Sequence, residues 1–421
     1  MTILRYGLQA IFLLICCLVL IALPVLLMPV KINYLQNFLV PTIQISTFVN
    51  FLAYVFTLIM IYRFDRFAGN QKISSSINML LAIYISLMLV ILVFRLPYSI
   101  KILLTGFVIS GIQLSLMIKA NVNKSRLNLA LIPCGITDRF KSIKPHKFSL
   151  LSETLTLQHQ ISALRSFDGL VVDFRSGNLS KEWESFVAHA AINGIPVYSA
   201  NHLYEAMTGS VDINHLMENN FGVLAPSKLY MAIKRLIESL LIIVFSPVII
   251  LLSLLVALIV SRDGYGSVLF VQERIGLAGK KFAMYKFRTM TPQDSSKPQK
   301  LSDDHHRVTP IGAKLRKYRL DELPQLWNVL KGDMSLIGPR PETAVLHAED
   351  EKSVPFYAYR AIVRPGISGW AQVMHGYTSN SDQAWTKLTY DFYYIKHFSF
   401  WLDLLIVFRT IRVIFSGFGA K

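Results

Sequence analysis

Four long stretches without a charged side chain dominate the start of the chain: residues 6–30, 32–62, 73–94 and 102–118. A helix needs roughly 17–25 apolar residues to cross the hydrocarbon core of a bilayer, and each stretch reaches that length. Helices without a polar face cannot lie at the surface of a soluble protein. Because three more stretches follow the first, a cleaved signal peptide does not explain it. The pattern predicts an α-helical bundle of four transmembrane helices in residues 1–124.

The basic residues that flank these stretches are unevenly divided between the two sides of the membrane. With the N-terminus in the cytoplasm, three of them lie outside, namely Lys31, Arg95 and Lys101. The other seven lie inside: Arg5, Arg63, Arg66, Lys72, Lys119, Lys124 and Arg126. The positive-inside rule favours this orientation, and four crossings then return the chain to the cytoplasm.

The charge and the cysteines of the 421-residue chain exclude several classes of protein. A hydrophobic fraction of 53% excludes disorder, and three cysteines, two of them adjacent, exclude a disulfide scaffold. The net charge of +17 fits nucleic acid, an anionic membrane surface or a phosphorylated substrate. Residues 262–421 hold 23 Lys/Arg and 15 acids, without an RNP, zinc-finger or helix-turn-helix pattern. His305–His306 has no metal-ligand partners at a recognised spacing. We therefore expect no nucleic-acid partner.

Residues 125–227 are predicted to form a small α/β unit. Ser180–Ala191 has helical periodicity, with Ser180 as its N-cap, and Gly194–Ile195–Pro196 ends the helix. No GxGxxG follows the first strand, so a Rossmann-like sheet is predicted without a bound dinucleotide. We interpret the unit as a spacer or a dimerisation domain. Three short apolar runs suit buried parallel strands: Leu127–Ile132, Gly169–Phe174 and Ile195–Ser199.

A fifth uncharged run, residues 239–261, contains Ser246–Pro247. A fifth crossing would place the basic residues 262–421 outside the cell. Proline removes a backbone donor and clashes with the preceding turn, so we expect a kink or break at Pro247. Two interpretations follow. The run is either a spanning helix with a tolerated kink, or a re-entrant helix (residues 229–262) with both ends at the cytoplasmic headgroups.

Asp321 and Glu322 are adjacent carboxylates that closely follow Arg316 and Arg319. Such a pair ionises reluctantly unless cations or a metal stabilise it, and Mg²⁺ usually takes one or two protein carboxylates together with phosphate oxygens. A carboxylate can also attack phosphorus, while neighbouring Arg and Lys side chains bind pyrophosphate. Spacing alone also fits a simpler interpretation, in which the pair caps a helix that begins near Leu323 and the basic residues are solvated.

The basic block, from about Lys228 to Lys421, resembles the bacterial sugar transferases that act as monotopic phosphoglycosyl transferases. The resemblance covers close to half of the chain. Five motifs carry it: QERIG (272–276), KFRTM (286–290), RVTPIG (307–312), LDELPQLWNVLKGDMSLIGPRPE (320–342) and RPGISGWAQV (364–373). The four preceding helices and the α/β unit also resemble the extended branch of this family.

The resemblance implies a reaction and a role for each matched residue. Asp321 matches the nucleophile, which attacks the sugar-bearing phosphorus of a UDP-sugar and releases UMP. Undecaprenyl phosphate then attacks the aspartyl-phosphosugar, giving undecaprenyl-diphosphate-sugar. Glu322 matches the partner of the acidic dyad beside Mg²⁺, so both carboxylates are expected metal ligands. Four basic residues fall in motifs that bind the phosphates and the nucleotide: Arg316, Lys286, Arg288 and Arg340.

The resemblance also implies a topology. Ser246–Pro247 matches the break of the family's re-entrant helix, so residues 228–421 should form a mostly helical α/β catalytic domain that enters the membrane without crossing it. A polyprenyl phosphate presents its headgroup at the membrane surface, whereas a UDP-sugar is cytosolic. We therefore expect a multi-pass protein of the bacterial cytoplasmic (inner) membrane, with its catalytic domain on the cytoplasmic face and a homodimeric state. The apolar stretch from Phe398 should lie in the membrane interface, because Asp403 and Arg409 interrupt it.

One position departs from the family pattern, and two alternatives remain open. Arg319 stands where the family usually has a small residue, commonly serine, which bears on the loop before Asp321. The extended architecture favours glucose or galactose as the sugar; an N-acetylated amino sugar is the alternative. An inactive membrane scaffold is a further alternative, although the intact dyad argues against it. The product would start exopolysaccharide, capsule or lipopolysaccharide O-antigen repeat units.

Overall fold

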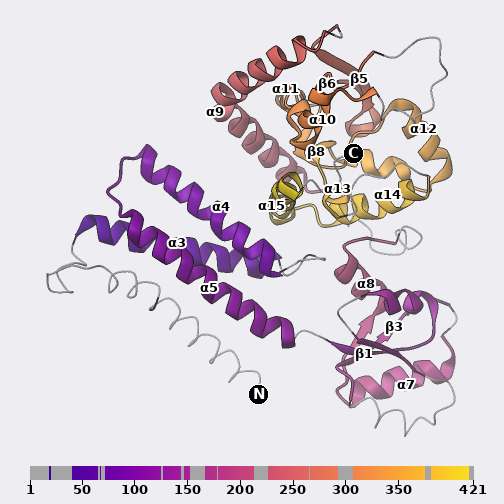
Figure 1. The fold of residues 1–421 in the computed structure, drawn as a ribbon. Coiled ribbons are helices and arrows are strands. Elements are labelled where there is room, and N and C mark those ends of the chain that lie inside the picture. Colours follow the sequence, from indigo (N-terminus) through magenta and orange to yellow (C-terminus); the bar gives the residue numbers. More distant parts are fainter. Residues whose placement is uncertain are drawn as a thin grey trace. The chain divides into compact units, whose positions relative to one another are not determined.

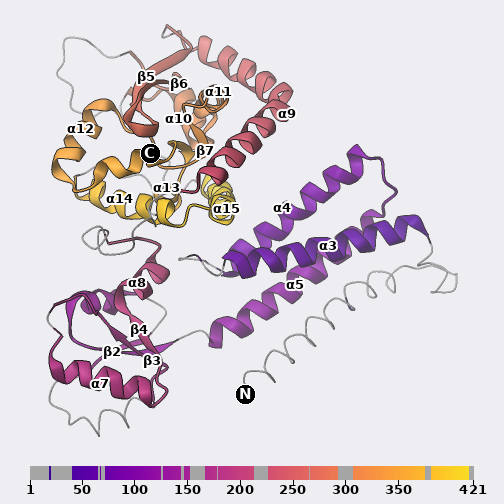
Figure 2. The ribbon, with the colours of Figure 1, turned by 180° about the vertical axis from the view of Figure 1, so that it is seen from behind.

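The structure is a computed structural model of the chain. It describes residues 19, 40–64, 67, 72–124, 127–143, 147–151, 166–177, 179–212, 226–264, 266–292, 307–374 and 381–416. The chain forms two compact units, Met1–Met207 and Thr208–Lys421, which are described separately (Figures 1 and 2). The first predicted membrane run, residues 6–30, lies outside the described residues apart from Val19, and His305–His306 lies outside them as well.

Three long apolar helices of the first unit are α3 (Pro41–Phe64), α4 (Lys72–Val93) and α5 (Ile100–Lys124). They pack through Tyr54, Leu80 and Leu114. The Asn50 side chain joins all three helices, because it donates to the Ile102 carbonyl at 2.9 Å and accepts from the Tyr84 hydroxyl at 2.9 Å. Buried polar contacts of this kind hold membrane helices together. Three of the four predicted N-terminal runs thus form helices long and apolar enough to cross a membrane.

A parallel four-stranded sheet with strand order β2-β1-β3-β4 follows the membrane helices. Its strands are β1 (Asn128–Leu131), β2 (Lys147–Leu150), β3 (Gly169–Val172) and β4 (Val197–Ser199). Three of these lie within the predicted strands, whereas the exposed edge strand β2 was not predicted. The predicted helix is α7 (Lys181–Ile192), and the Ser180 hydroxyl accepts from the Trp183 backbone N–H as its N-cap.

Both faces of this sheet are buried, as expected for a parallel sheet. Alternate strand residues point to opposite faces. Leu170 and Val172 pack with Phe186 of α7 on one face. On the other face, Val171 packs with Phe140 of the 3-10 helix η1 (Gly135–Ser142) and with Ala200 of α8 (Ala200–Thr208). Burial on both faces explains why the central strand β3 is apolar at every position.

The second unit begins with the long helix α9 (Lys228–Ser261) and the antiparallel hairpin β5 (Leu269–Ile275) and β6 (Lys281–Phe287). Short strands β7 (Ser335–Ile337) and β8 (Gly366–Ser368) pair in parallel. Among its described residues, the second unit also has three short 3-10 helices: η3 (Leu277–Gly279), η5 (Leu320–Glu322) and η6 (Tyr357–Ile362). The remaining helices are α10 (Pro310–Lys317), α11 (Gln325–Lys331), α12 (Ala344–Ser353), α13 (Trp370–Met374), α14 (Ser381–Lys396) and α15 (Phe400–Ser416).

Helix α9 bends near its middle, and Pro247 lies inside it (Figures 1 and 2). Proline has no N–H to donate to the carbonyl four residues earlier, which belongs to Ile243. The Ser246 hydroxyl donates to that same carbonyl at 2.7 Å, so the serine satisfies the group that the proline leaves without its helical partner. The predicted kink therefore has a physical cause in the adjacent pair Ser246–Pro247.

Both limbs of α9 pack on the second unit. In the first limb, the buried Lys234 ammonium donates to Asp403 Oδ2 of α15 at 2.7 Å and to the Tyr394 hydroxyl of α14 at 2.9 Å. In the second limb, Val256 and Val260 pack against Phe287 and Leu315. Most other large side chains of α9 are exposed and apolar. The two ends of this helix are thus anchored to one folded unit, while its sides offer a surface suited to lipid.

Candidate active site

The two adjacent carboxylates lie in η5, between α10 and α11. Helix α10 begins at Thr309, whose hydroxyl accepts from the Gly312 backbone N–H at 2.9 Å. A Cβ at Gly312 would lie 2.1 Å from the Thr289 carbonyl oxygen, so only glycine allows α10 to lie this close to the end of β6. The RVTPIG motif therefore places the helix that leads into the dyad.

Arg319 forms the turn from α10 into η5. Its backbone adopts the left-handed conformation, with φ of 54°, which is unfavourable for a residue with a side chain. Its guanidinium donates to Glu322 Oε2 at 3.3 Å. The position that departs from the family pattern is thus a strained turn whose side chain binds the second carboxylate of the dyad.

Glu322 is held between two arginines. Arg340, in the loop after β7, donates to Glu322 Oε1 at 3.1 Å, while Arg319 takes the other oxygen. Burial alone would raise the pKa of Glu322, but Arg340, Lys286 and Arg319 outweigh burial and hold that pKa below its ordinary value. Glu322 is therefore ionised at neutral pH, and its position is fixed.

Asp321 has a different environment. It is buried, and its carboxylate accepts no hydrogen bond from any residue that the structure describes. Burial and the neighbouring Glu322 charge raise the pKa of Asp321, against the attraction of Lys286, Arg316 and Arg340. One acid of the pair is thus bound and charged, while the other is more basic and has lone pairs free for a ligand. Environments that separate the pKa values of two acids assign them different roles.

Lys286 lies on β6, the strand that packs against the 3-10 helix η5 of the dyad. Burial and the charges of Arg340 and Arg274 lower the pKa of Lys286 to about 8, although Glu322 and Asp321 favour its charged form. Helix α11 holds β6 in place, because the Asn328 side chain accepts from Tyr285 N–H at 3.2 Å and donates to the Ala283 carbonyl at 2.7 Å. The structure places Lys286 close enough to the dyad for their charges to interact, while its assignment to substrate binding stays a prediction.

Arg316 and Arg288 have different surroundings. Arg316 Nε donates to the buried Thr289 hydroxyl at 2.9 Å. Burial raises the pKa of Asp321, and the positive charge of Arg316 opposes that rise. Arg288 instead donates to the Val260 carbonyl at 2.9 Å and to that of Ser267, where it braces the end of α9. Its assignment to the nucleotide stays a prediction. Thr289 orients Arg316 and was not predicted as a site residue. Its position in the KFRTM motif was the one sequence signal that could have indicated this role.

A second set of charges supports the loop that carries Arg340. Arg274 lies 3.9 Å from Glu342 Oε2 and donates to the Pro341 carbonyl at 3.0 Å. Burial and Arg340 lower the pKa of Arg274 to about 10. Sequence reasoning assigned no role to Arg274 or Glu342, although both lie in quoted motifs, because a pairing across 67 residues leaves no local pattern.

The donor chemistry of the dyad fits a magnesium ion. The described residues contain no group of three or more His, Cys, Asp or Glu side chains that could hold a metal. Mg²⁺ needs fewer protein ligands than that, since it retains waters and takes phosphate oxygens from its substrate. Asp321 offers two oxygens without hydrogen bonds, and each Glu322 oxygen retains a lone pair beside its arginine. Asp321 is the better donor of the two.

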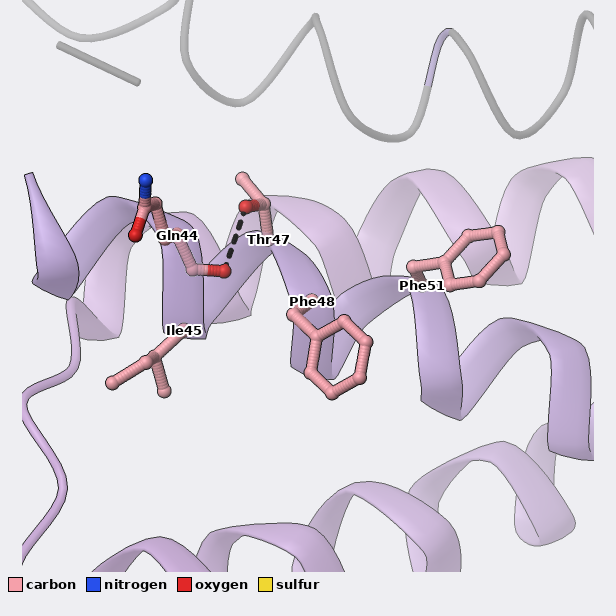
Figure 3. A pocket seen from close by; sticks show the side chains of 5 residues that line it. All are labelled: Gln44, Ile45, Thr47, Phe48 and Phe51. Carbon is pink, nitrogen blue, oxygen red and sulfur yellow. Dashed lines mark hydrogen bonds between the residues drawn. The ribbon is translucent and has the colours of Figure 1, made fainter. Parts of the chain in front are cut away.

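A hollow among the described residues lies elsewhere, on α3 of the first unit. Gln44, Ile45, Thr47, Phe48 and Phe51 line it (Figure 3). None of these side chains titrates, and the Thr47 hydroxyl is bonded to the Ile43 and Gln44 carbonyls at 2.8 and 3.0 Å. Because its lining is apolar and lies on a candidate membrane helix, this hollow offers no group for phosphate chemistry.

These features describe a membrane-associated enzyme with an acidic dyad in a strongly cationic site. The family model for bacterial sugar transferases matches residues 229–417. A UDP-N-acetylgalactosamine-undecaprenyl-phosphate N-acetylgalactosaminephosphotransferase from Aeromonas hydrophila is 40% identical over 88% of this chain and 86% of that protein. The chain therefore belongs to the bacterial sugar transferase family.

Other relatives match a smaller share of the chain. A UDP-glucose:undecaprenyl-phosphate glucose-1-phosphate transferase from Xanthomonas campestris pv. campestris is 41% identical over 39% of this chain and 35% of its own length. A UDP-galactose-lipid carrier transferase from Erwinia amylovora is 38% identical over 42% of this chain and 39% of its own length. The similarity to the Aeromonas protein covers more of the chain than the family model does, so it extends into the first half of the chain.

Proposed function

We propose that this protein transfers a sugar 1-phosphate from a UDP-sugar to undecaprenyl phosphate, giving undecaprenyl-diphosphate-sugar and UMP. The observation that carries the proposal is the asymmetry of the dyad. Asp321 has oxygens without hydrogen bonds in a cationic site, whereas Glu322 is held by Arg319 and Arg340. The names of the relatives support the acceptor and the type of reaction.

The proposed chemistry has two displacements at one phosphorus. An Asp321 oxygen attacks the sugar-bearing phosphorus, the bond from that phosphorus to the bridging oxygen breaks, and UMP leaves with the electron pair. A phosphate oxygen of undecaprenyl phosphate then attacks the same phosphorus, and the Asp321 carboxylate is released. The raised pKa of Asp321 suits a nucleophile, and its ionised form is favoured by the positive charges of Lys286 and Arg316.

The basic residues have separate tasks in this proposal. Lys286 and Arg316 neutralise the diphosphate and the charge that develops as UMP leaves. Arg340 contributes positive charge while it fixes Glu322. A magnesium ion held by Asp321, with Glu322 as the second carboxylate, would supply further positive charge to the diphosphate oxygens. Removal of the ion with EDTA should then stop the reaction.

We propose that α9 is re-entrant, with both ends at the cytoplasmic headgroups. The bend at Ser246–Pro247 and the anchoring of both limbs to the second unit support this topology. An undecaprenyl phosphate headgroup and a cytosolic UDP-sugar can meet only at that surface. On this proposal the protein lies in the bacterial inner membrane, and its product starts a polysaccharide repeat unit such as that of exopolysaccharide, capsule or O-antigen.

For the sugar, we propose N-acetylgalactosamine. The Aeromonas protein, which has that sugar in its name, matches 88% of this chain, whereas a glucose and a galactose transferase match 39% and 42% of it. Glucose or galactose, which the resemblance favoured, is the second candidate, because transferases named for these sugars are 41% and 38% identical to this chain over the parts that they match. The Rossmann-like interpretation of the parallel sheet and a homodimer also remain proposals.

The test uses membranes that contain the full chain, undecaprenyl phosphate and a panel of radiolabelled UDP-sugars. We expect lipid-linked product with UDP-N-acetylgalactosamine, and product with UDP-glucose or UDP-galactose alone would favour the second candidate. Absence of product from every UDP-sugar, with a related transferase active in the same membranes, would refute the proposed function and favour a scaffold.

A further inference from the structure

The loop that carries Arg340, residues Gly338–Glu342, contains two prolines and is held through its carbonyl groups. Pro339 and Pro341 have no N–H, so their backbone can only accept hydrogen bonds. Four consecutive carbonyls each accept a hydrogen bond from a distant part of the chain. The pairs are Gly366 N to Pro339 O (2.8 Å), Arg360 Nη2 to Arg340 O (3.0 Å), Arg274 Nη1 to Pro341 O (3.0 Å) and Ile275 N to Glu342 O (3.1 Å).

Arg360 differs from the other three donors because it binds the carbonyl of Arg340 itself. It lies on η6, is 8% exposed, and its Nη2 is shared between that carbonyl and Asp391 Oδ2 at 2.9 Å. Its Nη1 donates to the Tyr357 hydroxyl and lies 3.9 Å from Glu342 Oε1. Asp391, on α14, is 2% exposed. The guanidinium is therefore fixed on one side by buried acceptors and holds the loop on the other.

We propose that Arg360 and Asp391 are positioning residues for Arg340, and thereby for the Glu322 carboxylate. The inference rests on the proposed function, in which Arg340 and Glu322 are part of the reacting site. Arg340 reaches Glu322 Oε1 at 3.1 Å, so a displacement of its backbone moves that contact directly. Arg360 itself is buried among Asp391, Tyr357 and Glu342, and its charge is balanced there. Its effect on the reaction passes through the Arg340 backbone.

The contacts of Arg360 require the planar, forked guanidinium group of an arginine. Arginine has donors on two nitrogens that can reach the carbonyl, the carboxylate and the hydroxyl together, whereas a lysine ammonium is a single point with three donors. Arg360→Lys keeps the charge but cannot reproduce the arrangement. A misplacement of about 1 Å in an active site can reduce activity by about a hundredfold. We therefore expect Arg360→Lys to lower kcat/KM by between about tenfold and about a hundredfold.

The test is a double-mutant cycle in the full chain with Arg360→Lys and Arg340→Ala, measured as transfer of sugar 1-phosphate to undecaprenyl phosphate. If Arg360 acts through Arg340, Arg360→Lys should change kcat/KM by less than about twofold once the Arg340 side chain is gone. An equal loss in both backgrounds, or no loss in the wild-type background, would overturn the inference.

The controls separate a positioning role from simple destabilisation. Arg409 is a second arginine in the same unit, on α15, and its guanidinium lies over the Trp370 ring at 4.7 Å. Arg409→Lys should affect both backgrounds equally. If Arg360→Lys fails to fold, Tyr357→Phe replaces it, because it removes one acceptor and leaves the ring. A wild-type protein without activity, or full activity of Arg340→Ala, would instead indicate failure of the proposed function.

Discussion

The pH dependence of the reaction should depend on a single lysine. Burial and the charges of Arg340 and Arg274 lower the pKa of Lys286 to about 8, so its positive charge is lost as the pH rises through that value. Lys286 binds the diphosphate only in its charged form on the proposed mechanism. The profile of kcat/KM reports ionisations of the free enzyme. It should therefore fall with a slope of −1 above about pH 8.

The size of the effect follows from the pKa. One unit above the pKa, about one molecule in eleven retains the proton, so kcat/KM at pH 9 should be about tenfold below its plateau. Once the diphosphate is bound, its negative charge favours the protonated lysine. The descending limb of kcat should accordingly lie at higher pH than that of kcat/KM.

The matched control variant is Lys286→Arg. Its side chain stays charged across this pH range because an arginine loses its proton only at much higher pH than a lysine. Its activity is expected to be lower, since the guanidinium is larger, but its kcat/KM should be flat from pH 7 to pH 9.5 at constant magnesium. The assay is UMP release at subsaturating UDP-sugar. A wild-type profile that is flat to pH 9.5, or the same descending limb in Lys286→Arg, would refute the assignment.

Three further outcomes test other parts of the account. Asp321→Asn should lower UMP release as well as lipid-linked product by about 10³-fold or more, because attack by Asp321 comes first; UMP release at the wild-type rate would exclude the covalent step. In a cysteine-free background, single cysteines at Ser227 and Ser267 should both be shielded from an impermeant thiol reagent in intact cells, and labelling at Ser267 alone would indicate a spanning α9. A chain that starts at Thr208 should melt at a higher temperature than one that starts at Lys228, and equal melting temperatures would contradict the packing described below.

Features of the fold that depend on local pattern were predicted from the sequence. Uncharged length was enough for three of the four predicted N-terminal helices, the fourth lying outside the described residues. Short apolar runs between turn residues were enough for three of the four strands. Strand β2 was missed because it is an exposed edge strand, with the residues Lys147–Leu150 mostly facing solvent. An edge strand buries neither face continuously, so it lacks the apolar run by which the buried strands were recognised.

The candidate site was predicted in part. Residues within short motifs were found from the sequence, whereas contacts between residues far apart in the chain were not. The dyad and the basic residues near it were found because short motifs contain them. The partners of those residues lie far away in the chain: Arg340 is 18 residues from Glu322, and Arg360 is 31 residues from Asp391. The strained turn at Arg319 was visible only as a departure from the family pattern. Its contact with Glu322 needed the structure.

The start of the catalytic unit shows the same limit. Charge and hydropathy change near Lys228, which is why the sequence predicts a domain boundary there. That boundary stays a prediction; by its internal contacts, the second compact unit includes the residues from Thr208 onward. The buried Trp370 donates its indole N–H to the Gly209 carbonyl at 2.7 Å, and Val211 N–H donates to the Thr389 carbonyl at 3.0 Å. A truncation at Lys228 removes the partner of a fully buried indole, which costs about 1–3 kcal/mol for an unsatisfied donor. Gly209 and Val211 are thus part of the fold that supports the active site.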